Sequence, residues 1–300
     1  MTSHKPRVAL PMMTAALALL VASCNRQTQT TKNDTSPPPT TTTGTSGSVA
    51  ESAPPAGGET TTAATHVPGE STGRDPEAIK ALEKMGDYLK TLKAFQVRTE
   101  TNRDEVLDDG QSVEFDGVAD VIVDRPNRLR ADVVSDRQQR QYFYDGKSLS
   151  VWARRVNYYA TVPAPPTIHE LIDTLSSRFD IELPVADLFY WSDRKSTDHI
   201  TGAIDVGPSQ VGGVTCGHYA FRQEGTDWEV WIQRGNYPLP RKVVIKTLTD
   251  EARPRFASVL TWNLAPSFND AAFTFVPPPD AKKIALAEVN GSEPEHSSGH

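Results

Sequence analysis

Hydrophobic and polar positions along this chain change period several times, and each period predicts one kind of element. Between Ile79 and Leu92 the apolar residues recur every three or four positions, which is the spacing of an amphipathic helix. Asp75 and Pro76 precede this stripe, and they are a favoured N-cap and a favoured first helical residue. We therefore predict a helix from Asp75 to about Lys93 that covers one face of a sheet.

From Phe95 onward the apolar positions alternate with polar ones, and this period of two is typical of strands with one buried face. Asp109-Gly110 and Asp145-Gly146 mark reversals between neighbouring strands. The first strand starts at Phe95, and the other predicted strands are residues 113–123, 128–135, 141–144, 148–153, 157–162, 199–206, 210–223, 227–234, 241–249, 255–264 and 273–275. They form about ten antiparallel strands in one domain of roughly 210 residues, a size at which single sheets still occur.

Two helical segments interrupt the series of strands. Thr167 and Glu170 have the spacing of a capping box, which predicts that a helix begins there. Residues 184–190 are predicted to add a short second helix. With the helix that starts at Asp75, these segments can cover one face of the sheet. The predicted fold class is therefore α+β, a large curved antiparallel sheet with covering helices.

Large aromatic residues occur on both sides of several predicted strands. Trp228 and Val230 share one side of their strand and Trp231 the other, while Trp152 lies opposite Leu149 on another strand. Two interpretations stay open: these residues fill a core, or the curved sheet leaves an apolar concavity that holds a ligand such as an acyl chain. The candidate residues of that concavity are Trp152, Trp228, Val230, Trp231 and Trp262.

The N-terminus has the layout of a secretory signal peptide. Lys5 and Arg7 precede an apolar run over residues 8–21, and small residues then lead into Cys24. This order resembles a bacterial lipoprotein box, in which the cysteine is diacylated, the chain is cleaved before it, and the new amine is acylated. We expect residues 1–23 to be a signal peptide and Cys24 to carry lipid. A plain signal peptide with an incidental cysteine is the alternative.

Residues 24–74 are expected to be a disordered tether behind the lipidated cysteine. Between Asn25 and Arg74 there is no Leu, Ile, Phe, Met, Trp or Tyr, and Thr, Pro, Ser, Gly and Ala dominate. Without large apolar side chains the segment cannot offset the entropy lost on ordering. The folded domain is then residues 75–287, and the polar tail 288–300 is expected to be disordered as well.

Charge and cysteine content exclude several classes of function. The formal net charge is −7, and an acidic chain without a dense basic patch is a poor nucleic-acid binder. If Cys24 carries lipid, Cys216 has no intramolecular partner, so the fold has no internal disulfide. Cys216 is interpreted as a small buried residue rather than a nucleophile.

Catalytic motifs are absent from the sequence. There is no GxSxG, no HExxH, no phosphate-binding glycine loop and no dinucleotide fingerprint. His218 with Asp227 is the nearest approach to a catalytic or metal-binding pair, but one histidine and one aspartate make neither a triad nor a metal site. We therefore expect no catalytic residue, no metal and no cofactor, and interpret the protein as a non-enzyme.

Several short motifs resemble one known family. They are Tyr144-Asp145-Gly146-Lys147 with Tyr159 and Pro163; Leu183-Pro184 with Ala186-Asp187-Leu188; Cys216, His218 and Phe221; Asp227-Trp228 and Trp231-Ile232; and Pro238-Leu239-Pro240-Arg241-Lys242. From about Asp75 to Ala287 the chain resembles the uncharacterised periplasmic family called domain of unknown function 2092, within the LolA/LolB lipoprotein-carrier-like group. The resemblance implies a half-open antiparallel β-barrel closed by helices over an apolar concavity, which in the carriers holds lipoprotein acyl chains.

The sequence and the resemblance together lead to one functional hypothesis. We expect a lipid-anchored periplasmic binding protein that holds a lipid, an acyl chain or another apolar ligand in its concave sheet. Asn25 is not the aspartate that follows the lipidated cysteine of many proteins retained at the inner membrane, so the expected location is the inner leaflet of the outer membrane. The alternatives are an envelope sensor or scaffold that binds another protein without a small ligand, and a hydrolase.

Overall fold

The computed structural model describes residues 73–192 and 197–289 of the chain. The predicted signal peptide, Cys24, the tether up to residue 72 and residues 290–300 of the predicted tail lie outside these ranges. Within the described ranges, no helix is both long and apolar enough to cross a membrane.

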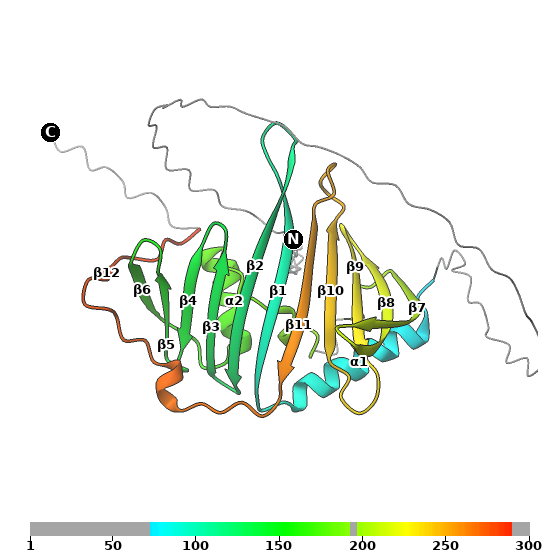
Figure 1. Ribbon diagram of the computed structural model, residues 1–300, viewed down its shortest axis with the longest axis horizontal. Coiled ribbons are helices and arrows are strands. Elements are labelled where there is room, and N and C mark those ends of the chain that lie inside the picture. The colour runs from blue at the N-terminus through cyan, green and yellow to red at the C-terminus, as the bar shows by residue number, and fades with distance from the viewer. Residues whose placement is uncertain (1–72, 193–196, 290–300) are drawn as a thin grey trace, which may run out of the picture. The chain divides into compact units, whose positions relative to one another are not determined.

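One large sheet organises the described part of the chain. Its strands are β1 (Ala94–Val106), β2 (Ser112–Asp124), β3 (Arg128–Ser135), β4 (Gln139–Tyr144), β5 (Ser148–Ala153), β6 (Tyr158–Pro163), β7 (Gly202–Val211), β8 (Val214–Gln223), β9 (Thr226–Gln233), β10 (Pro240–Thr247), β11 (Arg255–Asn263) and β12 (Lys282–Lys283). They pair in the order β12-β6-β5-β4-β3-β2-β1-β11-β10-β9-β8-β7 (Figure 1). All neighbours are antiparallel except β12, which runs parallel to β6. The sheet is curved but unclosed, because β7 and β12 remain separate edges.

Three helices pack on one face of this sheet, which we call the helix face. They are α1 (Pro76–Thr91), α2 (Ile168–Phe179) and α3 (Asp187–Tyr190), and Figure 1 shows α2 behind the strands β2–β4. Asp75 caps α1 by accepting the backbone N–H of Glu77. The Thr167 hydroxyl accepts the backbone N–H of Glu170 at the start of α2, as the capping box predicts. The buried residues of all three helices belong to the same core as the helix face.

The centre of the helix face is fully dry. Val97 of β1 pairs with Val121 of β2, which pairs with Ala131 of β3, and all three residues have zero exposure. The opposite face, which we call the outer face, carries the alternating positions such as Arg98, which pairs with Asp120 at 2.7 Å. Period two along the strands thus separates an apolar side from a polar side. The predicted fold class, a large curved antiparallel sheet with covering helices, is confirmed.

The boundary between β7 and β8 differs from the prediction. One predicted strand ends at residue 206 and the next begins at residue 210, but β7 continues to Val211. A bulge between Asp205 and Gly207 absorbs the irregularity, and Pro208 is tolerated because β7 is an edge strand whose outward N–H has no ladder partner. The reversal lies at Gly212-Gly213, whose φ values of 55° and 78° suit glycine.

The end of the domain also differs from the prediction. Residues 273–275 do not form a strand; Phe273 ends the 3-10 helix η2 (Asp270–Phe273) and is buried. The last strand is β12, only two residues long, which brings the sheet to twelve strands instead of about ten. Beyond it the chain reaches α2, where Glu288 forms an ion pair with Arg178 at 2.6 Å. The alternation of Phe273 and Phe275 just before the proline run that starts at Pro277 cannot distinguish a strand from an extended segment packed on one.

Candidate functional site

The five residues predicted to line a cavity lie on two different faces of the sheet. Trp228 and Val230 are buried on the helix face, and Trp262 is half-buried against the same core. The Trp262 indole donates to the Pro240 carbonyl at 2.8 Å. These three residues are positioned by β9 and β11, and they are the part of the predicted set that the structure brings to the helix face.

Trp152 and Trp231 lie on the outer face, away from that core. Trp152 donates to the Asn157 side chain at 3.2 Å, and its ring lies 6.1 Å from that of Phe275. Trp231 belongs to a small separate cluster with Cys216. The five residues therefore do not line one common cavity.

An aromatic stack joins the helix layer to the sheet. The ring of Trp228 lies 4.4 Å from Phe221 of β8 and 6.0 Å from Trp191, both in stacked orientation. Trp191 follows α3 and is half-buried, so it forms the partly exposed end of the stack. The sequence pattern does not indicate Trp191, because this residue follows a predicted short helix and no periodicity assigns it to a face.

Next to this stack the helix face becomes accessible to solvent. Trp228 pairs with Ile245 of β10, Ile245 with Phe256 of β11, and Phe256 with Arg103 of β1, so these four residues form one row across the sheet. Ile245 and Phe256 are half-buried and Arg103 is exposed, whereas Val97, Val121 and Ala131 at the centre of the strands have zero exposure. The apolar layer is thus closed at the centre of the strands and partly open at this end.

Charged residues stand at this accessible end. Glu105 of β1 is 5% exposed and forms ion pairs with Arg103 at 2.8 Å and with Arg137 at 2.7 Å. The Arg137 guanidinium also lies over the Phe115 ring at 4.1 Å. A single buried carboxylate therefore holds two guanidinium groups at the margin of the apolar surface.

Two carboxyl groups, one on the segment between α2 and α3 and one on the first residue of α3, have perturbed pKa values. Burial, together with the charge of Glu182, raises the pKa of Asp187 to about 6. Burial also raises the pKa of Glu182, with Asp180 acting in the same direction and Arg103 in the opposite one. Both residues keep some solvent exposure, so their carboxyl groups lie among many protein atoms but within reach of water. Because the charge of Arg103 acts on the pKa of Glu182, the segment between α2 and α3 lies near the accessible end of the helix face.

His218 lies in a stacked cluster on the outer face rather than in a catalytic arrangement. Its ring stacks on Trp231 at 3.9 Å, and the Lys242 ammonium lies 4.6 Å from the same indole ring. The partner of His218 is Glu229 at 2.8 Å, whereas Asp227, considered from sequence, forms its bonds with Arg222. This cluster is a cross-strand ladder of π contacts with the imidazole held by one carboxylate.

A reactive thiol and a metal-binding cluster are two further kinds of site to consider. Cys216 is a buried free thiol, as predicted, and burial raises its pKa, which disfavours the reactive thiolate. In the part of the chain that the structure describes, no group of three or more His, Cys, Asp or Glu residues is placed to hold a metal ion.

Comparison with known proteins gives one family match and several structures with a similar course of the chain. The family model described as "Predicted periplasmic protein (DUF2092)" matches residues 78–287. No curated protein matches the chain.

The lipoprotein LppX of Mycobacterium tuberculosis is 16% identical over 65% of this chain and 100% of its own, with a TM-score of 0.42. LprF of Mycobacterium bovis is 14% identical over 65% and 97%, with a TM-score of 0.38. A LolA superfamily protein of Nitrosomonas europaea is 10% identical over 66% and 97%, with a TM-score of 0.32.

Proposed function

Because the chain belongs to this family of predicted periplasmic proteins, we propose that it is a lipid-anchored binding protein of the cell envelope. Its ligand is a lipid, an acyl chain or another apolar molecule, and the binding surface is the helix face of the sheet. Binding of this kind needs no covalent step, no metal and no cofactor. The protein would then receive, hold or sense its ligand at a membrane rather than transform it.

The observation that carries the proposal is the one-sided opening of the apolar helix face. Ile245 and Phe256 keep part of their surface in water while the adjacent Trp228 is buried in the core. An acyl chain laid against this row would remove that surface from water, and each methylene that it buries contributes about 0.8 kcal/mol. Arg103 and Arg137 stand at the margin, where the polar end of such a ligand would remain in contact with water.

The anchor completes the proposal. A diacylated and N-acylated Cys24 would hold the chain at the periplasmic side of the outer membrane, and the tether of residues 25–74 would give the domain a typical reach of about 40 Å. Cell fractionation of the Cys24→Ser variant tests this part: the protein should move from the membrane fraction to the soluble one. Unchanged membrane association would contradict the anchor.

The test of ligand binding uses the full chain with Cys24→Ser, so that its own lipid does not interfere, and the fluorescent fatty acid cis-parinaric acid. Ile245→Asp places a carboxylate in the accessible row and is expected to weaken binding at least tenfold, about 1.4 kcal/mol. Val259→Asp is the matched control, because Val259 is 37% exposed on the outer face of the neighbouring strand. Circular dichroism confirms folding, and the milder Ile245→Ala covers the case in which the aspartate prevents it.

Lipid extraction and native mass spectrometry of the protein purified from cells give the independent measurement. A co-purifying lipid that is lost in Ile245→Asp and retained in Val259→Asp supports the proposal. A protein that carries no lipid and does not bind cis-parinaric acid would overturn it.

A second candidate function is an envelope scaffold that binds another protein, and the outer face favours it. Val259 pairs across the sheet with Glu100, Glu100 with Val118, and Val118 with Val134, which is 50% exposed. Apart from Glu100, this row is apolar, and the described helices α1, α2 and α3 pack on the opposite face. In-cell cross-linking from Val134 should then give one dominant protein partner, and Val134→Lys should abolish it.

A further inference from the structure

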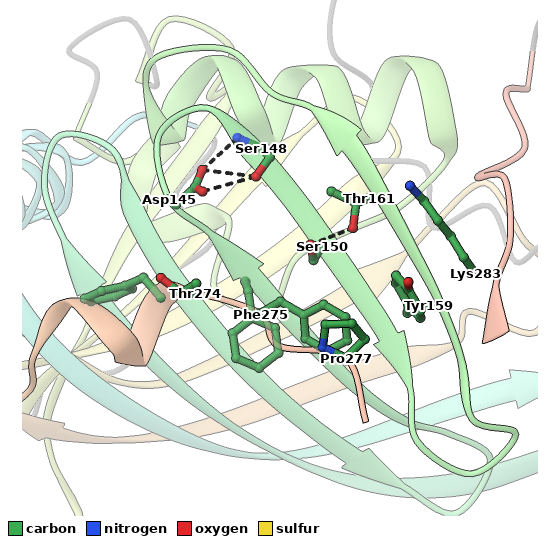
Figure 2. Close-up of a pocket in the computed structure, with 11 residues that line it drawn as sticks. Asp145, Ser148, Ser150, Tyr159, Thr161, Thr274, Phe275, Pro277 and Lys283 are labelled. Carbon is green, nitrogen blue, oxygen red and sulfur yellow. Dashed lines mark hydrogen bonds between the residues drawn. The ribbon is translucent and has the colours of Figure 1, made fainter. Parts of the chain in front are cut away.

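The C-terminal segment crosses the outer face of the sheet and encloses a pocket there. The pocket has a volume of about 300 Å³ and lies between β4–β6 and residues 273–283 (Figure 2). It is on the opposite side of the sheet from the helix face, because Phe143 and Ser150 alternate with the core residues Tyr144 and Leu149. Ligand binding in this pocket is therefore independent of the proposed apolar site.

The segment that forms the roof is fixed at both sides. At one side Asp270 of η2 forms an ion pair with Arg128 of β3, whose guanidinium also lies over the Phe273 ring at 5.2 Å. At the other side the backbone N–H groups of Lys282 and Ile284 donate to carbonyls of residues 157 and 159 at 3.0 and 2.8 Å. The chain between these anchors spans β4 and β5, so the pocket is a built feature of the fold.

One wall of the pocket is aromatic. The Phe275 ring lies 5.3 Å from Phe143 and 5.3 Å from Tyr159, and Pro277 continues this wall. Figure 2 shows Phe275, Pro277 and Tyr159 on the same side of the pocket. Such faces bind flat, C–H-rich surfaces.

The strand side of the pocket is a row of hydroxyl groups. Ser150 is 6% exposed, and its hydroxyl lies 2.9 Å from that of Thr161. The Ser148 hydroxyl donates to the Asp145 carboxylate at 3.2–3.3 Å. Lys283 extends beside Thr161 (Figure 2) and forms no ion pair with the described residues, so its ammonium is available to a ligand.

We propose that this pocket binds a saccharide unit of one or two rings. An acyl chain does not fit the chemistry, because it would strip water from the hydroxyls and from Lys283 without replacing the lost hydrogen bonds. A sugar hydroxyl both donates and accepts, so it pairs with serine and threonine hydroxyls and with an ammonium, while the C–H face of its ring packs on Phe275 and Tyr159. The volume lies at the small end of the range for ligand sites, which suits one or two rings and not a whole glycolipid.

The test is saturation-transfer difference NMR on the full chain with glucose, N-acetylglucosamine and the β-1,4-linked dimer of N-acetylglucosamine as separate probes. We expect transfer to the ring C–H protons of at least one of them. Thr161→Val and Lys283→Ala should each reduce this transfer at least fivefold. Thr261→Val is the matched control, because Thr261 is also an exposed threonine on the outer face but belongs to β11, outside the pocket.

Each result decides the proposal. Transfer that falls in Thr161→Val and Lys283→Ala and persists in Thr261→Val supports it. Absence of transfer from all three sugars overturns it, and so does transfer that Thr161→Val and Lys283→Ala leave unchanged while their circular dichroism matches the parent. Binding of cis-parinaric acid is measured in parallel, so failure of the apolar site and failure of the sugar site are separate outcomes.

Discussion

Asp187 is a half-buried carboxyl group whose environment raises its pKa. Asp187 is the first residue of α3, near the accessible end of the helix face, and its pKa is raised to about 6. A raised carboxyl pKa means that the folded state holds its proton more tightly than the unfolded chain. The stabilising contribution is therefore complete below the unfolded value, 3.8, and is lost as the pH rises through about 6.

The variant Asp187→Asn removes this pH dependence. It should unfold with a free energy about 1–2 kcal/mol higher than the parent at pH 8, a figure reduced from the full shift because the residue keeps some exposure. At pH 4 the two proteins should differ little. Urea unfolding at both pH values measures this, with the exposed Asp280→Asn as control. Equal stability of parent and Asp187→Asn at pH 8 would show that the carboxylate is well solvated.

Among the elements, α1 depends on one position where no side chain fits. A Cβ on Gly86 would fall far inside van der Waals contact with the Trp191 carbonyl oxygen. Gly86→Ala raises helix propensity by about 1 kcal/mol, but overpacking against a fixed backbone costs about 1–3 kcal/mol. We expect a net loss of about 1–2 kcal/mol in urea unfolding and a displaced Trp191.

The control for this prediction lies on the same helix. Lys84→Ala changes an exposed position of α1, so its stability should stay within about 0.5 kcal/mol of the parent. Tryptophan fluorescence should shift in Gly86→Ala and not in Lys84→Ala. A Gly86→Ala protein more stable than the parent would mean that α1 and the end of α3 separate easily.

Sequence periodicity predicts elements well where one face is buried and poorly where a segment lies on a surface. The helix at Asp75, the helix at Thr167 and the strands from β1 to β6 follow from spacing and caps, because those features are local. The course of residues 273–283 does not follow, since it depends on Arg128 and β6, which are more than a hundred residues away in sequence. The continuation of β7 through Pro208 does not follow from spacing either, because sequence alone does not say which strand lies at an edge of the sheet.

At the scale of the whole molecule, alternation predicts the side of a strand but not what covers it. Trp228 and Trp231 are correctly assigned to opposite faces from sequence, yet the same reasoning could not tell that Trp152 and Trp231 would share the outer face. The face of the sheet on which a residue lies depends on the register between neighbouring strands, and the sequence does not display that register. For the same reason the pocket beneath residues 273–283 was not predicted.

The two free edges of an unclosed sheet are a liability for the whole molecule, and this chain protects both. At the β12 edge the strand is two residues long and consists of lysines, Lys282 and Lys283. At the β7 edge Ala203 bonds with Gly73 and Asp75, and farther along Pro208 offers no N–H. Short strands, lysine and proline are the devices that prevent edge-to-edge pairing.

Replacing Pro208 tests this protection. Pro208→Val restores an N–H and β propensity beside Val206, which is 40% exposed, so we expect concentration-dependent self-association in light scattering after size exclusion. Because the change is at a solvent-facing edge, the free energy of unfolding should remain within about 0.5 kcal/mol of the parent. Adding Val206→Lys should restore the parent's behaviour, since a charge on the edge opposes pairing. If Pro208→Val behaves like the parent at every concentration, the bulge at Asp205 and Gly207 alone is sufficient to keep the edge unpaired.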